Sequence, residues 1–223
     1  MIFDDFATKL KQDYDLFLFA LAGRYLTLMA PGAEVSPHMV RQMQEQGAAL
    51  AKTFLRSASA RVDDFAQSYP LADSDVRSAR FKRELSNIAA QNIHTLMQRM
   101  KGGAQNTLAG VKEAHGAIGL LLQQKLSNPD FRIKTPKGRS FDAASYLLAE
   151  ARNYAYQSWI EFTLAQIAQT SDLAQVNYPN PEHVGHGTVF SISGQTPGYK
   201  SFEEIKLMFH YNSTAFITHH VPA

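Results

Sequence analysis

Apolar residues recur every three or four positions through most of the first 175 residues, and this periodicity constrains the fold more than any other feature. Residues 3–29 carry the pattern and predict one long helix or two short ones, ended by Pro31. Ser36 followed by Pro37 predicts the start of a second helix, because proline suits the first helical position. A third helix is predicted over residues 75–100. The N-terminal region is therefore expected to be a set of packed helices.

Glycines punctuate the segment that follows, residues 102–119. Gly102 and Gly103 stop the third helix as a helix C-cap does. Three more glycines, at positions 110, 116 and 119, fall inside an otherwise helical run, and each costs about 0.5–1 kcal/mol relative to alanine. Two explanations stay open: close helix packing, or a segment that becomes ordered on assembly.

A further helix, rich in aromatic residues, is predicted over residues 141–170. The negative charge of Asp142, near the helix start, interacts favourably with the positive N-terminal end of the helix dipole. Tyr146, Tyr154 and Trp159 are spaced to lie on one apolar stripe. We therefore expect these aromatic side chains to pack in the core.

The remaining C-terminal part changes character. Tyr178-Pro179-Asn180-Pro181 breaks the helical pattern, and short strands and loops are predicted over residues 176–223. The predicted fold class is α+β. It combines a predominantly helical region, residues 1–130, with a small β-containing C-terminal domain within residues 131–223.

Composition excludes several classes of protein. The chain has no cysteine, which rules out disulfides, thiolate metal sites and a cysteine nucleophile, and which fits synthesis in a reducing cytoplasm. Asp15 and Arg24 cut the apolar run 14–30 to a stretch too short for the roughly 20 residues of a membrane span. Asp4 and Asp5 stand where a signal peptide would be basic. We therefore expect no membrane span and no signal peptide.

A dense cationic stretch occupies residues 132–139. Its four basic residues have no acidic neighbour within the stretch, which we expect to be a loop: Arg132, Lys134, Lys137 and Arg139. The net charge of the whole chain is only +2, so the chain as a whole shows no electrostatic signature of nucleic-acid binding. The stretch is either a solvated loop or a contact with DNA phosphates or an acidic neighbouring subunit.

The order of motifs in the last third is similar to that of a known family. It begins with a Gly-Arg pair, an aromatic residue, Ser-Tyr and a helical arginine. A Gly, then Val-Phe-Ser-Ile-Ser-Gly, a tyrosine and a closing asparagine follow. This segment resembles the C-terminal part of tailed-phage minor capsid proteins, the Mu gpF-like head-morphogenesis or minor capsid protein 2 group. The residues that carry the resemblance are Gly138, Arg139, Tyr146, Arg152, Gly187, Phe190, Ser191, Gly194, Tyr199 and Asn212.

The resemblance implies a minor structural protein of the virion, associated with the portal inside the head. It would act in head morphogenesis, DNA packaging or ejection, within a multi-subunit assembly. Its partners would be the portal protein, other capsid or neck proteins, and packaged DNA through residues 132–139. Where the family ends in Asn-Cys-Arg-His, this chain has Asn212-Ser213-Thr214-Ala215. Because the Cys, Arg and His are missing, we expect a structural module without enzymatic activity or cofactor.

The sequence offers three alternatives to this interpretation. His183 and His186 are spaced like two metal ligands, but without a cysteine or a second close pair the sequence predicts no metal site. Arg152, Ser191-Ile192-Ser193 and Glu203-Glu204 follow the order of the Arg, Ser-x-Ser and Glu residues of ADP-ribosyltransferases. The third alternative is a host-encoded helical adaptor or a toxin-like module that uses the same fold.

Overall fold

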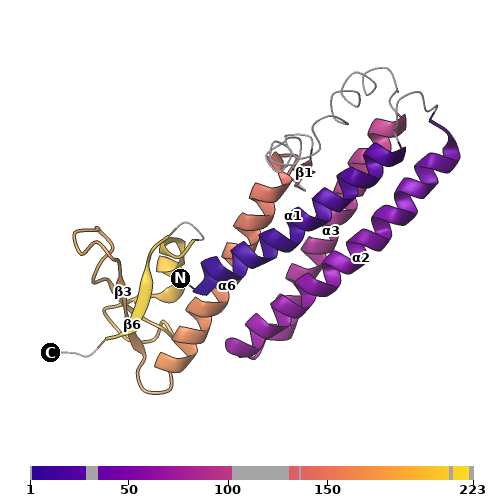
Figure 1. Cartoon of the computed structure of the whole chain (residues 1–223). Coiled ribbons are helices and arrows are strands. Elements are labelled where there is room, and N and C mark those ends of the chain that lie inside the picture. The colour runs from indigo at the N-terminus through magenta and orange to yellow at the C-terminus, as the bar shows by residue number, and fades with distance from the viewer. Residues whose placement is uncertain (1, 29–34, 102–130, 136, 211–212, 221–223) are drawn as a thin grey trace.

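A computed structural model describes residues 2–28, 35–101, 131–135, 137–210 and 213–220. Four long helices of this described part form a bundle, and a small sheet lies beyond one end of it (Figure 1). Helices dominate the N-terminal part and the larger sheet is built from C-terminal segments, so the predicted α+β class is confirmed. The segment 102–119 and Asn212 lie outside the described residues.

The first three helices follow the sequence pattern closely. The helix α1 spans Ile2–Leu28, so the segment predicted as one helix or two is a single helix. The helix α2 spans Pro37–Ser68, and the Ser36 hydroxyl accepts a hydrogen bond from the Met39 N–H at 3.3 Å, which caps its first turn. The helix α3 spans Ser74–Lys101, within one residue of both predicted ends.

The fourth helix, α6, spans Ala143–Ile167, so the predicted range of 141–170 was too long at both ends. Its first predicted residues belong to the strand β2, Ser140–Asp142, which pairs with β1, Arg132–Lys134. The Asp142 carboxylate accepts a hydrogen bond from the Ser145 N–H at 2.8 Å and caps the helix. The extended backbone required for strand pairing therefore sets the helix start.

Aromatic side chains from all four helices meet in the core of the bundle. Phe6 of α1, Phe65 of α2, Phe81 of α3 and Tyr154 of α6 are all buried. The rings of Phe81 and Tyr154 stack at 4.6 Å and 8°, and those of Phe6 and Phe65 lie 4.7 Å apart. Such pairs contribute roughly 0.5–1.5 kcal/mol beyond the burial of their area. The prediction that Tyr154 packs in the core is confirmed.

Polar pairs fix how the helices align along one another. Arg61 of α2 donates two hydrogen bonds to the Asp13 carboxylate of α1, at 2.5 and 3.0 Å. Deeper in the bundle, the Asn92 amide of α3 donates to the Tyr14 hydroxyl of α1, and both side chains are fully buried. A shift of one helix along another would leave these buried groups without partners, which is costly.

The C-terminal sheet has the strand order β5-β4-β3-β6. The strand β3, Leu173–Asn177, pairs antiparallel with β4, Val189–Ser191, and with β6, Phe216–His219. The strand β5, Lys200–Ser201, pairs parallel with β4 and leads into the short helix α7, Phe202–Ile205, and a turn of 3-10 helix, Lys206–Met208. The strand β3, the first of this sheet along the chain, thus begins three residues before the region 176–223 that was predicted to hold strands and loops.

The helix α6 contributes to two separate cores. Its residues up to Ala155 belong to the bundle core, whereas Tyr156, Ile160 and Leu164 pack with the sheet. The residues Phe131 and Ile133 also pack in the bundle core. The sequence placed a division at residue 130, but in the structure the apolar packing changes partner within α6, because one continuous helix runs through both parts.

Candidate functional site

The basic stretch 132–139 is part of a β-hairpin: Arg132 and Lys134 lie on the strand β1, whereas Lys137 and Arg139 lie in the turn before β2, where the sequence predicted a loop. In this hairpin Lys134 lies opposite Ser140. The turn is closed by hydrogen bonds from the Thr135 N–H to the Arg139 carbonyl at 2.9 Å and from the Gly138 N–H to the Thr135 carbonyl at 2.8 Å. Gly138 has φ +76°, a conformation that suits glycine because it lacks a Cβ. All four basic side chains are exposed on this closed frame.

The hairpin is anchored to the bundle. Ile133, between the two exposed cations of β1, is 1% exposed and packs in the bundle core. The side-chain amide of Gln91 on α3 accepts a hydrogen bond from the Lys134 N–H at 3.0 Å and donates to the Lys134 carbonyl at 3.5 Å. Arg132 donates to the Ser140 hydroxyl at 2.7 Å and to its carbonyl at 2.9 Å. The backbone of β1 is thus held in place relative to α3.

Two residues of the family-like motif on α6 tie this helix to its neighbours. The Tyr146 hydroxyl donates to the Glu84 carboxylate of α3 at 3.0 Å. Burial, together with the nearby Glu150 and Glu84 carboxylates, raises the pKa of Tyr146. Arg152 forms an ion pair with Asp4 of α1 at 3.2 Å. Both motif residues therefore connect helices.

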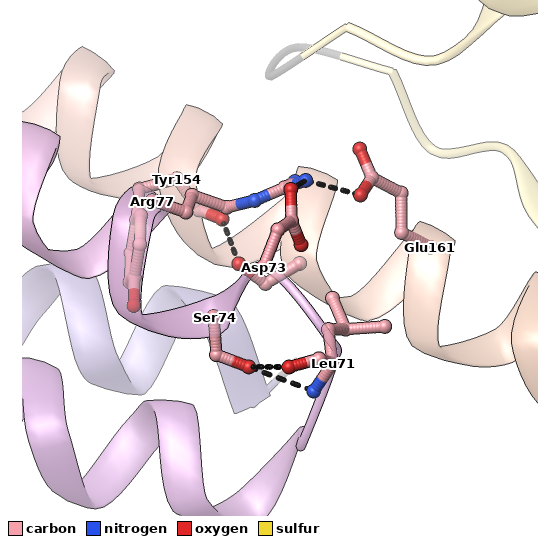
Figure 2. Close-up of polar contacts among 7 residues, drawn as sticks. Leu71, Asp73, Ser74, Arg77, Tyr154 and Glu161 are labelled. Atoms are coloured by element: carbon pink, nitrogen blue, oxygen red, sulfur yellow. Dashed lines mark hydrogen bonds and ion pairs between the residues drawn. The ribbon is translucent and has the colours of Figure 1, made fainter.

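A groove of about 650 Å³ runs between α3 and α6. Figure 2 shows Arg77 of α3 reaching across to Glu161 of α6, while it also pairs with Asp73 at 2.9 Å. Partial burial opposes the charge of Arg77, but its hydrogen bonds to Glu161 and Asp73 outweigh that effect and raise its pKa. Burial, and then repulsion from Glu84, raises the pKa of Glu150 in the same groove. The side chains of this groove serve to join the two helices.

The Ser-Ile-Ser-Gly part of the motif is folded around one carboxylate, Asp172. Its Oδ2 atom accepts hydrogen bonds from the Ser191 and Thr196 hydroxyls, each at 2.5 Å, and its Oδ1 atom accepts from the Ser193 N–H at 2.7 Å. These hydrogen bonds hold the pKa of Asp172 well below its usual value. At the end of the loop Gly194 has φ +73°. The motif is therefore a turn that connects β4 to the segment leading to β5.

The other motif residues of the sheet have packing roles or lie at the surface. Phe190 of β4 is completely buried in the second core. The Gly187 N–H donates to the Val176 carbonyl of β3 at 2.8 Å. Tyr199 is 41% exposed. The described motif residues thus spread over the hairpin, α6 and the sheet.

In both candidate metal ligands, His183 and His186, the Nδ1 atom of the ring makes a local hydrogen bond. His183 stacks on Tyr178 at 3.6 Å, and its Nδ1 atom accepts from the Gly185 N–H at 3.1 Å. The Nδ1 atom of His186 accepts from the Tyr178 N–H at 3.1 Å. Among the described residues no group of three His, Cys, Asp or Glu side chains is arranged to hold a metal ion. These contacts shape the loop after β3.

The residues compared with ADP-ribosyltransferases each pair with a different part of the chain. Arg152 lies within α6, as predicted, and pairs with Asp4. Ser191 is bonded to Asp172, and Glu204 accepts hydrogen bonds from the Ser201 N–H and hydroxyl at the start of α7, at 2.7 and 2.8 Å. Arg152 thus joins two helices, Ser191 closes a turn and Glu204 caps a short helix.

Sequence reasoning missed Asp172 and the pair of Arg77 with Glu161. An aspartate just before a strand, with a Ser-x-Ser that starts at the last residue of the next strand, is a signal that could have suggested the Asp172 loop. No pattern in the sequence links Arg77 with Glu161, because 84 positions separate them. Long-range ion pairs of this kind become visible only when the helices are placed side by side.

No protein-family model matches this chain, and comparisons with curated proteins and with solved structures also found no match. None of the helices in the described part of the chain has the length and apolar character needed to cross a membrane.

Proposed function

We propose that this chain is a minor structural protein of a tailed-phage virion, made in the host cytoplasm and placed at the portal inside the head. It acts in head morphogenesis, DNA packaging or ejection without enzymatic activity. The proposal starts from the resemblance in the last third of the sequence. The observation that carries it is that α6 follows the basic hairpin directly and packs first in the bundle core and then with the C-terminal sheet, so it ties both parts of this segment together.

The contacts of the motif residues support an architectural role. Tyr146 and Arg152 join α6 to α3 and α1, and Ser191 closes the turn around Asp172. A catalytic set would need its side chains directed at one reacting atom. Here the side chains of Tyr146, Arg152 and Ser191 instead hold neighbouring elements together, which suits a protein whose task is to present rigid surfaces to partners.

The basic hairpin is the surface that we assign to partner contact. Its cations are exposed, while Ile133 and Gln91 fix the strand on the bundle. A cationic surface that is already rigid loses little conformational entropy when it binds. Packaged DNA and an acidic surface of the portal or a neck protein both fit its charge.

Mass spectrometry of purified virions, combined with cross-linking, tests the proposal. We expect the chain in purified heads, with cross-links to the portal or to another head protein. The quadruple variant R132Q/K134Q/K137Q/R139Q should reduce its incorporation or the amount of packaged DNA. A matched control neutralises four exposed cations of α1 and α2, R24Q/R41Q/K52Q/R56Q, and should leave both unchanged. Absence of the chain from purified virions would refute the proposal.

A further inference from the structure

A second cationic surface adjoins the hairpin on its α3 side. A groove of about 780 Å³ lies between the C-terminal half of α3 and β1. None of the described residues that line it is acidic, and three are cationic. The lining residues are Ala90, Gln91, His94, Thr95, Gln98, Arg99, Arg132 and Lys134.

The strand β1 presents its cations to this groove for a simple geometric reason. Successive side chains of a strand point to opposite faces, so the burial of Ile133 turns Arg132 and Lys134 outward together. The two hydrogen bonds of Gln91 with the Lys134 backbone hold this strand beside α3. Helix and strand thus form the two walls of one groove. The acid nearest in register is Asp142, opposite Arg132, and its carboxylate caps α6.

The uncharged members of the lining indicate what the groove can bind. The Gln98 amide offers a hydrogen-bond donor beside the cations and contacts His94 at 3.2 Å, whereas the Thr95 hydroxyl donates to the Gln91 carbonyl at 2.9 Å. Phosphate oxygens accept hydrogen bonds from both classes of donor. No Phe, Tyr or Trp side chain is among the described lining residues, so the groove lacks the large aromatic faces on which successive unpaired bases stack. The chemistry therefore favours the backbone of a duplex over a single strand.

We infer that the α3–β1 groove, continued by Lys137 and Arg139 on the hairpin turn, binds the phosphate backbone of duplex nucleic acid without reading its bases. The inference deepens the proposed function and rests on it for the source of the duplex, the packaged genome. The net charge of +2 gives the whole chain little attraction for DNA, so binding depends on this local group of cations.

Fluorescence anisotropy with the full chain tests this inference. Two labelled 30-base-pair duplexes of unrelated sequence are titrated between 50 and 200 mM NaCl. If three or four phosphates are contacted, affinity should fall about 40- to 150-fold over this range, because each phosphate contributes about −0.9 to the slope of log K against log salt. Both duplexes should bind equally.

Charge variants locate the binding surface. R132Q/K134Q should lower the magnitude of the salt slope by about 1.8, since two phosphate contacts are lost. The control K52Q/R56Q removes the same charge from exposed positions of α2 and should keep the wild-type slope. Equal losses in both variants, or a preference for one duplex sequence, would overturn the inference. So would binding of polyglutamate but not of duplex, which would assign the groove to an acidic protein.

The outcome is separable from that of the proposed function. Duplex binding is measured on the isolated chain, whereas the virion role is measured by the presence of the chain in purified heads. A chain that binds duplex through this groove but is absent from virions would refute the proposed function and leave the groove assignment standing. A chain that is found in virions but does not bind duplex would refute the groove assignment and leave the proposed function standing.

Discussion

Replacement of Asp172 by asparagine should destabilise the C-terminal sheet although it hardly changes the size of the side chain. The carboxylate accepts two hydroxyl hydrogen bonds on one oxygen and the Ser193 N–H on the other. An asparagine can keep its carbonyl oxygen toward the Ser193 N–H. Its NH₂ group then faces the hydroxyls of Ser191 and Thr196, which must reverse their hydrogen bonds, and Ser191 is completely buried.

The magnitude follows from these contacts. A hydrogen bond to a charged group contributes about 1.5–3 kcal/mol, and water around this partly exposed carboxylate favours the lower end for each of the two hydroxyl bonds. Because weaker neutral hydrogen bonds replace them, D172N should lose about 2 kcal/mol of stability and D172A about 3 kcal/mol. For a domain of this size, a loss of about 2 kcal/mol lowers the melting temperature by roughly 4–8 °C.

The dependence on pH separates this mechanism from a general packing defect. The pKa of Asp172 is lowered in the folded state, so the ionised carboxylate contributes its full stability above the unfolded pKa of about 3.9 and loses it as the pH falls further. Urea unfolding of wild type and D172N should therefore differ most near pH 7 and converge below about pH 4. D64N, which alters an exposed carboxylate of α2, serves as the control and should match the wild type at every pH. A difference between wild type and D172N that stays constant from pH 7 to pH 3 would refute the reasoning.

Two further comparisons test the packing of the bundle and the turn of the motif. Y154F removes only the hydrogen bond with Ser78, 2.9 Å long, and should cost about 1 kcal/mol, whereas Y154A also empties the aromatic cluster and should cost about 3–5 kcal/mol in urea unfolding. Equal losses for the two variants would contradict the packing role of the ring. G194A should lower the melting temperature, because φ is +73° and a Cβ would lie 3.1 Å from the Ser201 Cβ, at a cost of about 1–2 kcal/mol. G23A, on an exposed face of α1 with nothing within 4 Å of the new Cβ, should instead raise stability by about 1 kcal/mol, and a common sign for the two glycine variants would count against this explanation.

The helices of the bundle could be predicted from local chemistry. Ser36 and Pro37 mark the start of α2, and the pattern of apolar residues gives α3 to within one residue at each end. The start of α6 could not be predicted in this way. Residues 140–142 satisfy a helical pattern, but their backbone pairs with residues 132–134, and that contact depends on how the hairpin sits on the bundle.

The candidate binding surface was only half predictable. The density of basic residues in the stretch 132–139 was visible in the sequence, and their function as a DNA or portal contact remains a prediction. The contribution of α3 was not visible, because Gln91 and Arg99 stand well before the stretch and carry no motif. The hydrogen bonds of Gln91 hold β1 against α3, and this contact brings the residues of α3 and the cations of β1 to one groove.

By itself, the sequence determined the first three helices, the absence of cysteine chemistry, and which segment carries a dense positive charge. These properties depend on neighbours within a few positions, since periodicity, capping and charge density are local. The tertiary structure decided which distant residues meet: Arg77 with Glu161, and Asp172 with the Ser191 turn. Such meetings depend on how helices and strands pack, and many sequences with the same local pattern would pack differently.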